Sequence, residues 1–216
     1  SNRVRDLHLD SNGRLWLATT FGINYIDIYK SIGEQVEINN VLSSQTENSG
    51  LSYNDIIMVM EDKNGHLWLA SAGGGVNQIV DPSGEDFSFV YYTEKDGLKD
   101  DYILSLNEDI YGFIWIGTYN GLVKFEGVKF ELFNHHTRKD FNSNSATILY
   151  EDSKKKLWIG TNGDGLTCYN DHKFTMYTTE NGLLSNYINA ISEDYKGNIL
   201  IGTRKGVASL DTHGKI

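Results

Sequence analysis

Short apolar runs, each followed by a polar turn, recur along the whole chain. In the last complete example, residues 186–194, 199–203 and 207–210 are runs of strand length, separated by the polar turns 195–198 and 204–206. The middle run is apolar at nearly every position, which is typical of a strand buried on both faces of its sheet. The pattern therefore predicts consecutive antiparallel hairpins, and we name the strands of one unit the first, second, third and fourth.

One phrase, Leu-Trp-Leu-Ala-Thr or a close variant, marks the second strand of every unit. Its second position is held in turn by Trp16, Trp68, Trp115, Trp158 and Leu200. The copies are spaced by roughly 40 to 50 residues, which is the repeat length of a four-stranded propeller blade. We interpret this column as repeat core and not as a set of sugar-stacking rings. The small residue two positions later would make room for a neighbouring blade: Ala18, Ala70, Gly117, Gly160 and Gly202.

The turns between first and second strands share one chemistry. Residues 10–13 and 62–65 each begin with Asp and end with Gly. The Asp side chain can accept hydrogen bonds from the amides of the turn, and Gly supplies the positive φ that a tight hairpin requires. Lys155 takes the glycine position in the fourth unit. A Thr or Ser that closes each second strand is expected to bond across the next hairpin.

These features predict an all-β fold, a partial arc of about five four-stranded blades of a β-propeller. The approximate units are residues 1–49, 50–96, 97–139, 140–181 and 182–216, the last one incomplete. Residues 129–133 and 173–177 predict fourth strands, and the fifth unit has no counterpart. At the other end, Ser1-Asn2 aligns in register with Ser185-Asn186. We therefore expect the chain to be an arc of a larger propeller.

The full signature of a unit is more specific than its tryptophan. Gly-Leu is followed by Asn, an apolar pair, Glu-Asp, Gly, Leu-Trp-Ile-Gly-Thr and Gly-Leu, best preserved in residues 97–125, 182–210 and 140–169. This signature resembles the two-component regulator propeller repeat. The resemblance covers the chain except residues 28–49, and it departs from the pattern at Leu200 and Lys155.

The resemblance implies the periplasmic sensor region of Bacteroidetes hybrid two-component system proteins. Such sensors carry two seven-bladed propellers, an immunoglobulin-like domain, a membrane helix, and cytoplasmic kinase and regulator modules. They respond to oligosaccharides released from polysaccharides. It follows from the resemblance that this chain is a non-enzymatic part of a histidine kinase. Its expected partners are an oligosaccharide, the remaining blades, the downstream domains of the same chain and a second copy of the parent protein.

Composition narrows the alternatives. The 216 residues carry a net charge of −10, which disfavours nucleic-acid binding because an acidic surface repels phosphates. No apolar run approaches the ~18 residues of a membrane span. The single Cys168 excludes an internal disulfide, and its place in a third strand predicts a small core residue.

Candidate chemistry is sparse. Acidic pairs such as Glu61-Asp62 recur once per unit, so we interpret them as turn caps and not as catalytic carboxylates. Residues 10–13 begin like a calcium loop but lack its twelfth-position Glu. Neither His135-His136 nor Gly73-Gly74-Gly75 has the context of a zinc or phosphate site. We therefore predict no catalytic residue, metal or cofactor. A protein-interaction scaffold and a propeller lyase or hydrolase remain the alternatives.

A ligand is expected at one rim, where the first strands begin and the turns between second and third strands lie. Loops on a rigid scaffold are where binding residues gather. Aromatic rings with amides suit sugars, and the basic residues favour an acidic or sulfated one. The predicted rim residues are Arg3, Arg5, Phe21, Asp55, Tyr102, Tyr119, Asn120, Asn162, Asp164, Tyr187, Arg204 and Lys205.

Overall fold

A computed structural model describes residues 3–30, 36–43, 50–141 and 143–216. The alignment of Ser1-Asn2 with Ser185-Asn186 lies outside these residues. The chain divides into two compact units, unit 1 (Ser1–Leu106) and unit 2 (Asn107–Ile216). Among the described residues, no helix has the length and apolar composition that a membrane span requires.

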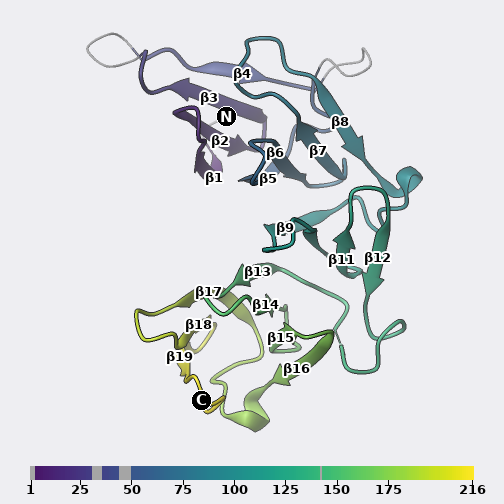
Figure 1. Ribbon diagram of the computed structural model, residues 1–216, viewed down its shortest axis with the longest axis vertical. Helices are drawn as coiled ribbons and strands as arrows, with labels where there is room; N and C mark the ends of the chain where they lie inside the picture. Colours follow the sequence, from purple (N-terminus) through teal and green to yellow (C-terminus); the bar gives the residue numbers. More distant parts are fainter. Residues whose placement is uncertain (1–2, 31–35, 44–49, 142) are drawn as a thin grey trace. The chain divides into compact units, whose positions relative to one another are not determined.

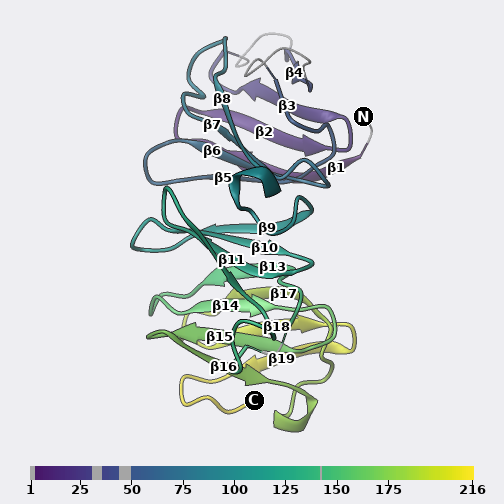
Figure 2. The same ribbon diagram turned by 90° about the vertical axis from the view of Figure 1, so that its right-hand side faces the viewer.

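Unit 1 contains two antiparallel four-stranded sheets, drawn in purple to blue in Figure 1. The first has the order β1-β2-β3-β4 and the second β5-β6-β7-β8, so each is a meander of consecutive hairpins. In Figure 2, β1, β2 and β3 run side by side. The strands are β1 (Val4–Leu9), β2 (Arg14–Thr19), β3 (Gly22–Asp27), β4 (Asn39–Val41), β5 (Ile56–Glu61), β6 (Leu67–Ser71), β7 (Val76–Ile79) and β8 (Phe89–Tyr92), followed by the 3₁₀ turn η1 (Glu94–Asp96).

Three further sheets follow, and β9 crosses the boundary between the units. Their orders are β12-β11-β10-β9, β13-β14-β15-β16 and the three-stranded β17-β18-β19. Within unit 2, β17 packs against β13 and β14. The strands are β9 (Ile103–Glu108), β10 (Ile114–Thr118), β11 (Gly121–Phe125), β12 (Phe130–Phe133), β13 (Ile148–Glu151), β14 (Leu157–Gly160), β15 (Leu166–Asn170), β16 (Lys173–Tyr177), β17 (Ile188–Glu193), β18 (Ile199–Thr203) and β19 (Gly206–Leu210), with the 3₁₀ turn η2 (Thr179–Asn181) after β16.

The all-β prediction is confirmed, and the strand predictions agree closely. The predicted strands 199–203 and 173–177 are β18 and β16, while the predicted strand 186–194 is shortened to β17. The last sheet, β17-β18-β19, has three strands within the described residues. The apolar runs and the turn signals thus place these strands to within a few residues.

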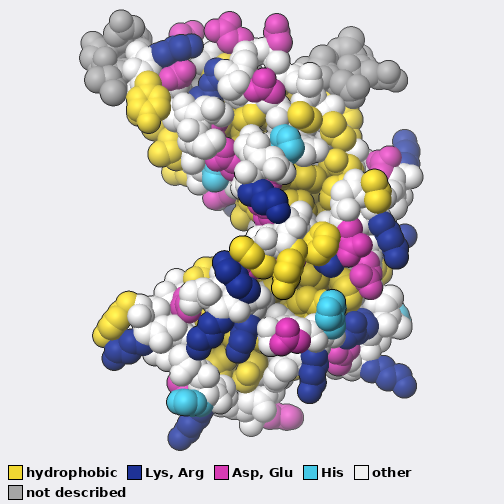
Figure 3. Space-filling view, in the orientation of Figure 1, with side chains coloured by type: hydrophobic (Ala, Val, Ile, Leu, Met, Phe, Trp, Pro, Cys, Tyr) yellow, Lys and Arg dark blue, Asp and Glu magenta, His cyan; other side chains and the backbone are white. Residues whose placement is uncertain are grey.

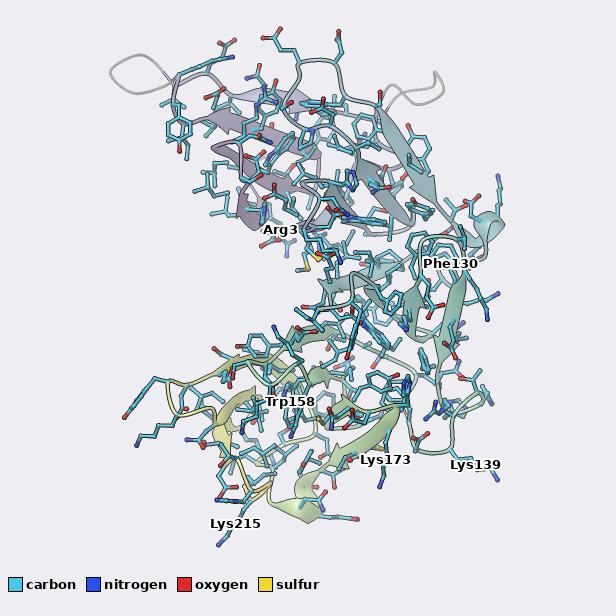
Figure 4. The ribbon with its side chains drawn as sticks, in the orientation of Figure 1. Arg3, Phe130, Lys139, Trp158, Lys173 and Lys215 are labelled. Carbon is cyan, nitrogen blue, oxygen red and sulfur yellow. The ribbon has the colours of Figure 1, made fainter. Side chains whose placement is uncertain are left out.

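The tryptophan column is core, as predicted. Trp16, Trp68, Trp115 and Trp158 are all buried, and Figure 4 shows Trp158 in the interior of unit 2, with Lys173 and Lys215 at its surface. Each indole nitrogen donates to the Asp that opens its own turn, at 2.8–2.9 Å. The other oxygen of that Asp accepts two amides of the turn, so one carboxylate ties the turn to the core.

Two other columns behave as predicted. The hydroxyl at the end of each second strand donates across the hairpin to the carbonyl of the glycine that opens the third strand or directly precedes it, at 2.7–3.0 Å. At Gly160, an added Cβ would lie 2.9 Å from Ile188, which belongs to the next repeat. The small residue therefore permits close packing of neighbouring sheets.

In two of the acidic pairs the Glu accepts hydrogen bonds from a neighbouring repeat, whereas the Asp bonds within its own turn. Glu61 accepts from the amide and hydroxyl of Ser11, and Glu193 accepts from the same two groups of Ser153 at 2.8 and 2.7 Å. The interpretation as turn caps holds for the Asp, but each of these two Glu residues caps the turn of the preceding repeat. These Glu residues therefore join consecutive repeats through hydrogen bonds.

Candidate functional site

In unit 1, two of the predicted rim residues form an ion pair. Arg5 donates to Asp55 at 2.8 Å, and both side chains are about one quarter exposed. The second carboxylate oxygen of Asp55 is buried without a hydrogen-bond partner. Phe21 and Arg3 are exposed, and Figure 4 labels Arg3 beside β1. Tyr102 pairs with Ala72 through a backbone bridge.

In unit 2, the fold brings three predicted residues together. The guanidinium carbon of Arg204 lies 3.9 Å from the centroid of the Tyr187 ring. The Arg204 amide also donates to the Tyr187 carbonyl at 3.2 Å, and Asn162 pairs with Tyr187 through a backbone bridge. The sequence analysis placed these residues on one rim, but it did not predict that the tyrosine ring would support the guanidinium.

The remaining predicted residues of unit 2 do not converge on one point. Asp164 accepts from the Ser143 hydroxyl at 2.8 Å, and the Asn120 carbonyl accepts from Asn134 at 3.0 Å. The Lys205 amide donates to Thr203 at 3.2 Å. Tyr119 is half exposed. On the face shown in Figure 3, Lys and Arg side chains lie over β13, β14 and β18.

A cavity of ≈ 500 Å³ opens at the other edge of the unit 2 sheets, where the Asp turns lie. We call it the Lys155 pocket. Its apolar wall contains Phe113, Trp115 and Tyr169, with the Trp115 and Tyr169 rings 5.1 Å apart. Its full lining is Asp109, Tyr111, Phe113, Trp115, Lys124, Glu151, Lys154, Lys155, Leu157, Tyr169, Asn170, Asp171 and His172.

Charged groups surround this apolar wall. The Lys124 ammonium lies 3.7 Å from the Phe113 centroid and 2.8 Å from Glu126. Lys155 approaches Glu151 at 3.6 Å. Burial raises the pKa of the Glu151 carboxyl, while the Ile110 amide and the charge of Lys155 act in the opposite direction. The pocket thus combines an aromatic surface with charges of both signs, a combination suited to a polar ligand with an apolar face.

Sequence reasoning missed the Lys155 pocket because it concentrated on the opposite edge. One departure from the repeat was available as a signal, because Lys155 occupies a glycine position. This substitution does not identify a cavity until the turns of two repeats and the hairpin after β15 are seen together.

The structure also places the single cysteine and the histidine pair. Cys168 is buried, and its surroundings raise the pKa of the thiol to about 12, so it is poorly suited to act as a nucleophile. His135 contacts the side chain of Asn144, and its ring centroid lies 3.6 Å from that of His136. Among the described residues, no group of three or more His, Cys, Asp or Glu side chains is arranged to hold a metal ion.

The repeat described above matches that of a known protein family. The two component regulator propeller matches residues 1–21, 50–73, 97–120, 140–163 and 182–205, more than half of the chain. The chain belongs to this family. The resemblance seen in the sequence is therefore confirmed, and with it the propeller repeat.

Individual proteins that resemble this chain also belong to two-component systems. Histidine kinase P4 from Formosa agariphila is 30% identical over 125 residues, which are 58% of this chain and 9% of that protein. The extracellular domain assigned to the hybrid two component system BT3049 from B. thetaiotaomicron is 24% identical, with a TM-score of 0.81 over 100% of this chain and 29% of that one. The chain thus spans only a small part of the length of these relatives.

The same fold also occurs in an enzyme. Virginiamycin B lyase from Staphylococcus aureus is 11% identical, with a TM-score of 0.70 over 99% of this chain and 69% of that one. At such low identity the similarity concerns the fold and not the chemistry.

Proposed function

We propose that this chain is part of the periplasmic sensing region of a hybrid two-component regulator and binds an acidic oligosaccharide without catalysing its breakdown. The family and its relatives support a role in two-component signalling. The observation that carries the choice of ligand is the stack of Arg204 on Tyr187.

The stack suits an anion for a geometric reason. Tyr187 is 39% exposed, and its ring lies directly beneath the guanidinium. No acceptor among the described residues takes a hydrogen bond from the Arg204 side chain, so its donors are available to a ligand. A planar guanidinium matches a carboxylate or sulfate with two parallel hydrogen bonds. Lys205 and Asn162, both exposed, add a charge and an amide nearby.

A signalling role requires that the ligand favour one state of the receptor over another. In this proposal the remaining blades, the downstream domains and a second copy of the receptor are the partners that carry the change. The rim of unit 2 supplies the binding energy, and the element that switches lies in those partners.

Thermal melting of the chain against neutral, uronate-containing and sulfated oligosaccharides tests this proposal. Ligand at 100 times its Kd stabilises the folded state by about 2.7 kcal/mol, so a saturable rise in Tm is expected with one acidic class. Arg204→Ala should abolish the rise. Lys196→Ala is the matched control, because it removes a cation 5.3 Å from the exposed Tyr195 ring in the same repeat.

The outcomes separate the alternatives. No rise in Tm with any sugar would overturn the proposal and favour a scaffold that binds protein. Cleavage of the sugar during the assay would favour a lyase or hydrolase. An equal loss of response in both variants would show that general surface charge, and not the stack, attracts the ligand.

A further inference from the structure

Backbone strain is concentrated around the Lys155 pocket. Throughout the described part of the chain, the non-glycine residues with positive φ are Lys155 at 66°, Asp171 at 49° and His172 at 63°. All three line this cavity. The left-handed region costs a residue with a side chain about 1–2 kcal/mol. Asp171 and His172 are the two central residues of the hairpin between β15 and β16, where a tight turn calls for positive φ. Lys155, by contrast, stands where the other repeats have glycine.

The glycine that Lys155 replaces is present in the other four Asp turns. Gly13, Gly65, Gly112 and Gly197 have φ values of 83–85°. A Cβ added at Gly197 would meet only ordinary contacts, the nearest at 3.5 Å. A lysine therefore fits this turn sterically, at the cost of backbone strain alone. In the fourth repeat this strained position places an ammonium group in the pocket.

The residue after the turn-opening Asp also affects this pocket. Ser153 donates both its amide and its hydroxyl to Glu193, whereas Ile110 has no hydroxyl and donates only its amide to Glu151, at 3.2 Å. Oε1 of Glu151 lies 3.6 Å from the Lys155 ammonium. A carboxylate oxygen thus stands in the cavity wall.

The corresponding space in unit 1 is filled by the protein itself. Arg14, at the position of Phe113, lies 4.9 Å from the Tyr25 centroid and donates to the carbonyls of Pro82 and Gly84. It is only 5% exposed. In the Lys155 pocket the pair is reversed, because Phe113 stands at the Arg14 position and the Lys124 ammonium lies 3.7 Å from its ring centroid. The cavity beside this pair has a size within the range of small-molecule sites.

The lining defines the kind of ligand. Tyr111 is 77% exposed, and its ring centroid lies 6.3 Å from that of Phe113, giving an aromatic surface on one side. Lys154 is exposed, and its ammonium makes no hydrogen bond or ion pair within the described residues. Asp109 is already saturated, because its oxygens accept from Tyr111, Phe113 and Trp115.

We infer that the Lys155 pocket binds a uronic acid unit of an oligosaccharide, which rests on the proposed sugar-sensing function. The apolar face of the sugar ring packs on Tyr111 and Phe113, and its carboxylate pairs with Lys154 and Lys155. Glu151 accepts from ring hydroxyls. This places a second sugar site at the edge opposite to the Arg204 stack.

Calorimetric titration of the chain with D-glucuronate, and with D-glucose as the neutral match, tests the inference. Loss of one charge-assisted hydrogen bond weakens binding by about tenfold or more. Lys154→Ala and Lys155→Gly should each weaken glucuronate binding to this extent. Lys155→Gly relieves backbone strain, so its lower affinity cannot result from failure to fold. Lys196→Ala, at the position equivalent to Lys154 in the fifth repeat, should bind like the parent chain.

The results distinguish this site from the rim. Glucuronate binding that survives Arg204→Ala but not Lys155→Gly supports the inference. Binding lost only in Arg204→Ala overturns it and leaves the proposed function intact. Equal binding of glucose and glucuronate overturns the assignment of the lysines. A chain that binds no sugar of any class overturns both proposals.

Discussion

The Trp158 indole nitrogen donates to Oδ2 of Asp152 at 2.8 Å, and this bond joins the turn of a repeat to its core. Both side chains are buried. The fifth repeat has Leu200 in place of tryptophan, and there Asn198 donates to the equivalent oxygen of Asp194 at 2.9 Å. The acceptor is thus satisfied in both forms of the repeat, as expected for a buried or partly buried carboxylate.

This relationship predicts a rescue. Trp158→Leu should destabilise the chain by several kcal/mol, because it leaves a cavity and an unpaired oxygen on Asp152. Adding Lys156→Asn, which copies Asn198, should recover about 1 kcal/mol of the free energy of unfolding. Denaturant unfolding of the two variants measures the difference, since the cavity is the same in both. Lys156→Asn alone should bring no gain, and a gain there would mean that the hydrogen bond is not the cause.

The backbone at Lys155 predicts a stabilising substitution. Lys155→Gly should raise the free energy of unfolding by about 0.5–1 kcal/mol, since relief of the left-handed strain exceeds the entropy cost of glycine. The ion pair with Glu151 offsets little of this gain, because the Lys155 side chain is 53% exposed.

Gly197→Lys is the reverse experiment in the fifth repeat, and we expect it to destabilise the chain by a similar amount. If Lys155→Gly lowers the stability instead, the lysine must hold the turn through Glu151 more strongly than its exposure indicates.

Acid stability should depend on Asp140. Arg138 donates two hydrogen bonds of 2.9 Å to this carboxylate and, with the Phe174 amide, lowers its pKa from 3.8 to about 2. A lowered folded-state pKa stabilises the fold fully above 3.8, and the contribution is lost as the pH falls towards 2. Asp140→Asn should therefore lower the Tm at neutral pH and flatten its dependence on pH in this window. Asp86→Asn, at an exposed position, should leave the acid limb of the profile unchanged.

The thiol of Cys168 should be unreactive in the folded chain. Burial raises its pKa to about 12, so the thiolate that attacks disulfide reagents is scarce at neutral pH. Titration with a chromogenic disulfide should give no reaction before unfolding and full reaction in denaturant. Rapid labelling of the native chain would show that β15 opens readily or that the cysteine is not core.

The sequence by itself determined the repeat and its local structure. Trp158, Thr161 and Asp152 recur in fixed columns. Trp158 is buried, as its column predicts. Thr161 and Asp152 make the predicted hydrogen bonds, which lie within one hairpin or one turn. Turn chemistry and strand period depend on neighbours in the chain, so they can be interpreted from residue order. The family assignment follows from the same columns.

Only the tertiary structure decided what residues from different repeats do together. Glu193 reaches the preceding repeat at Ser153, and Lys155 joins Tyr111 in one cavity. Each of these pairs is far apart in the chain, and their distances depend on how the sheets pack side by side. A pocket at such a junction leaves no continuous motif, because its lining is drawn from several turns and completed by packing.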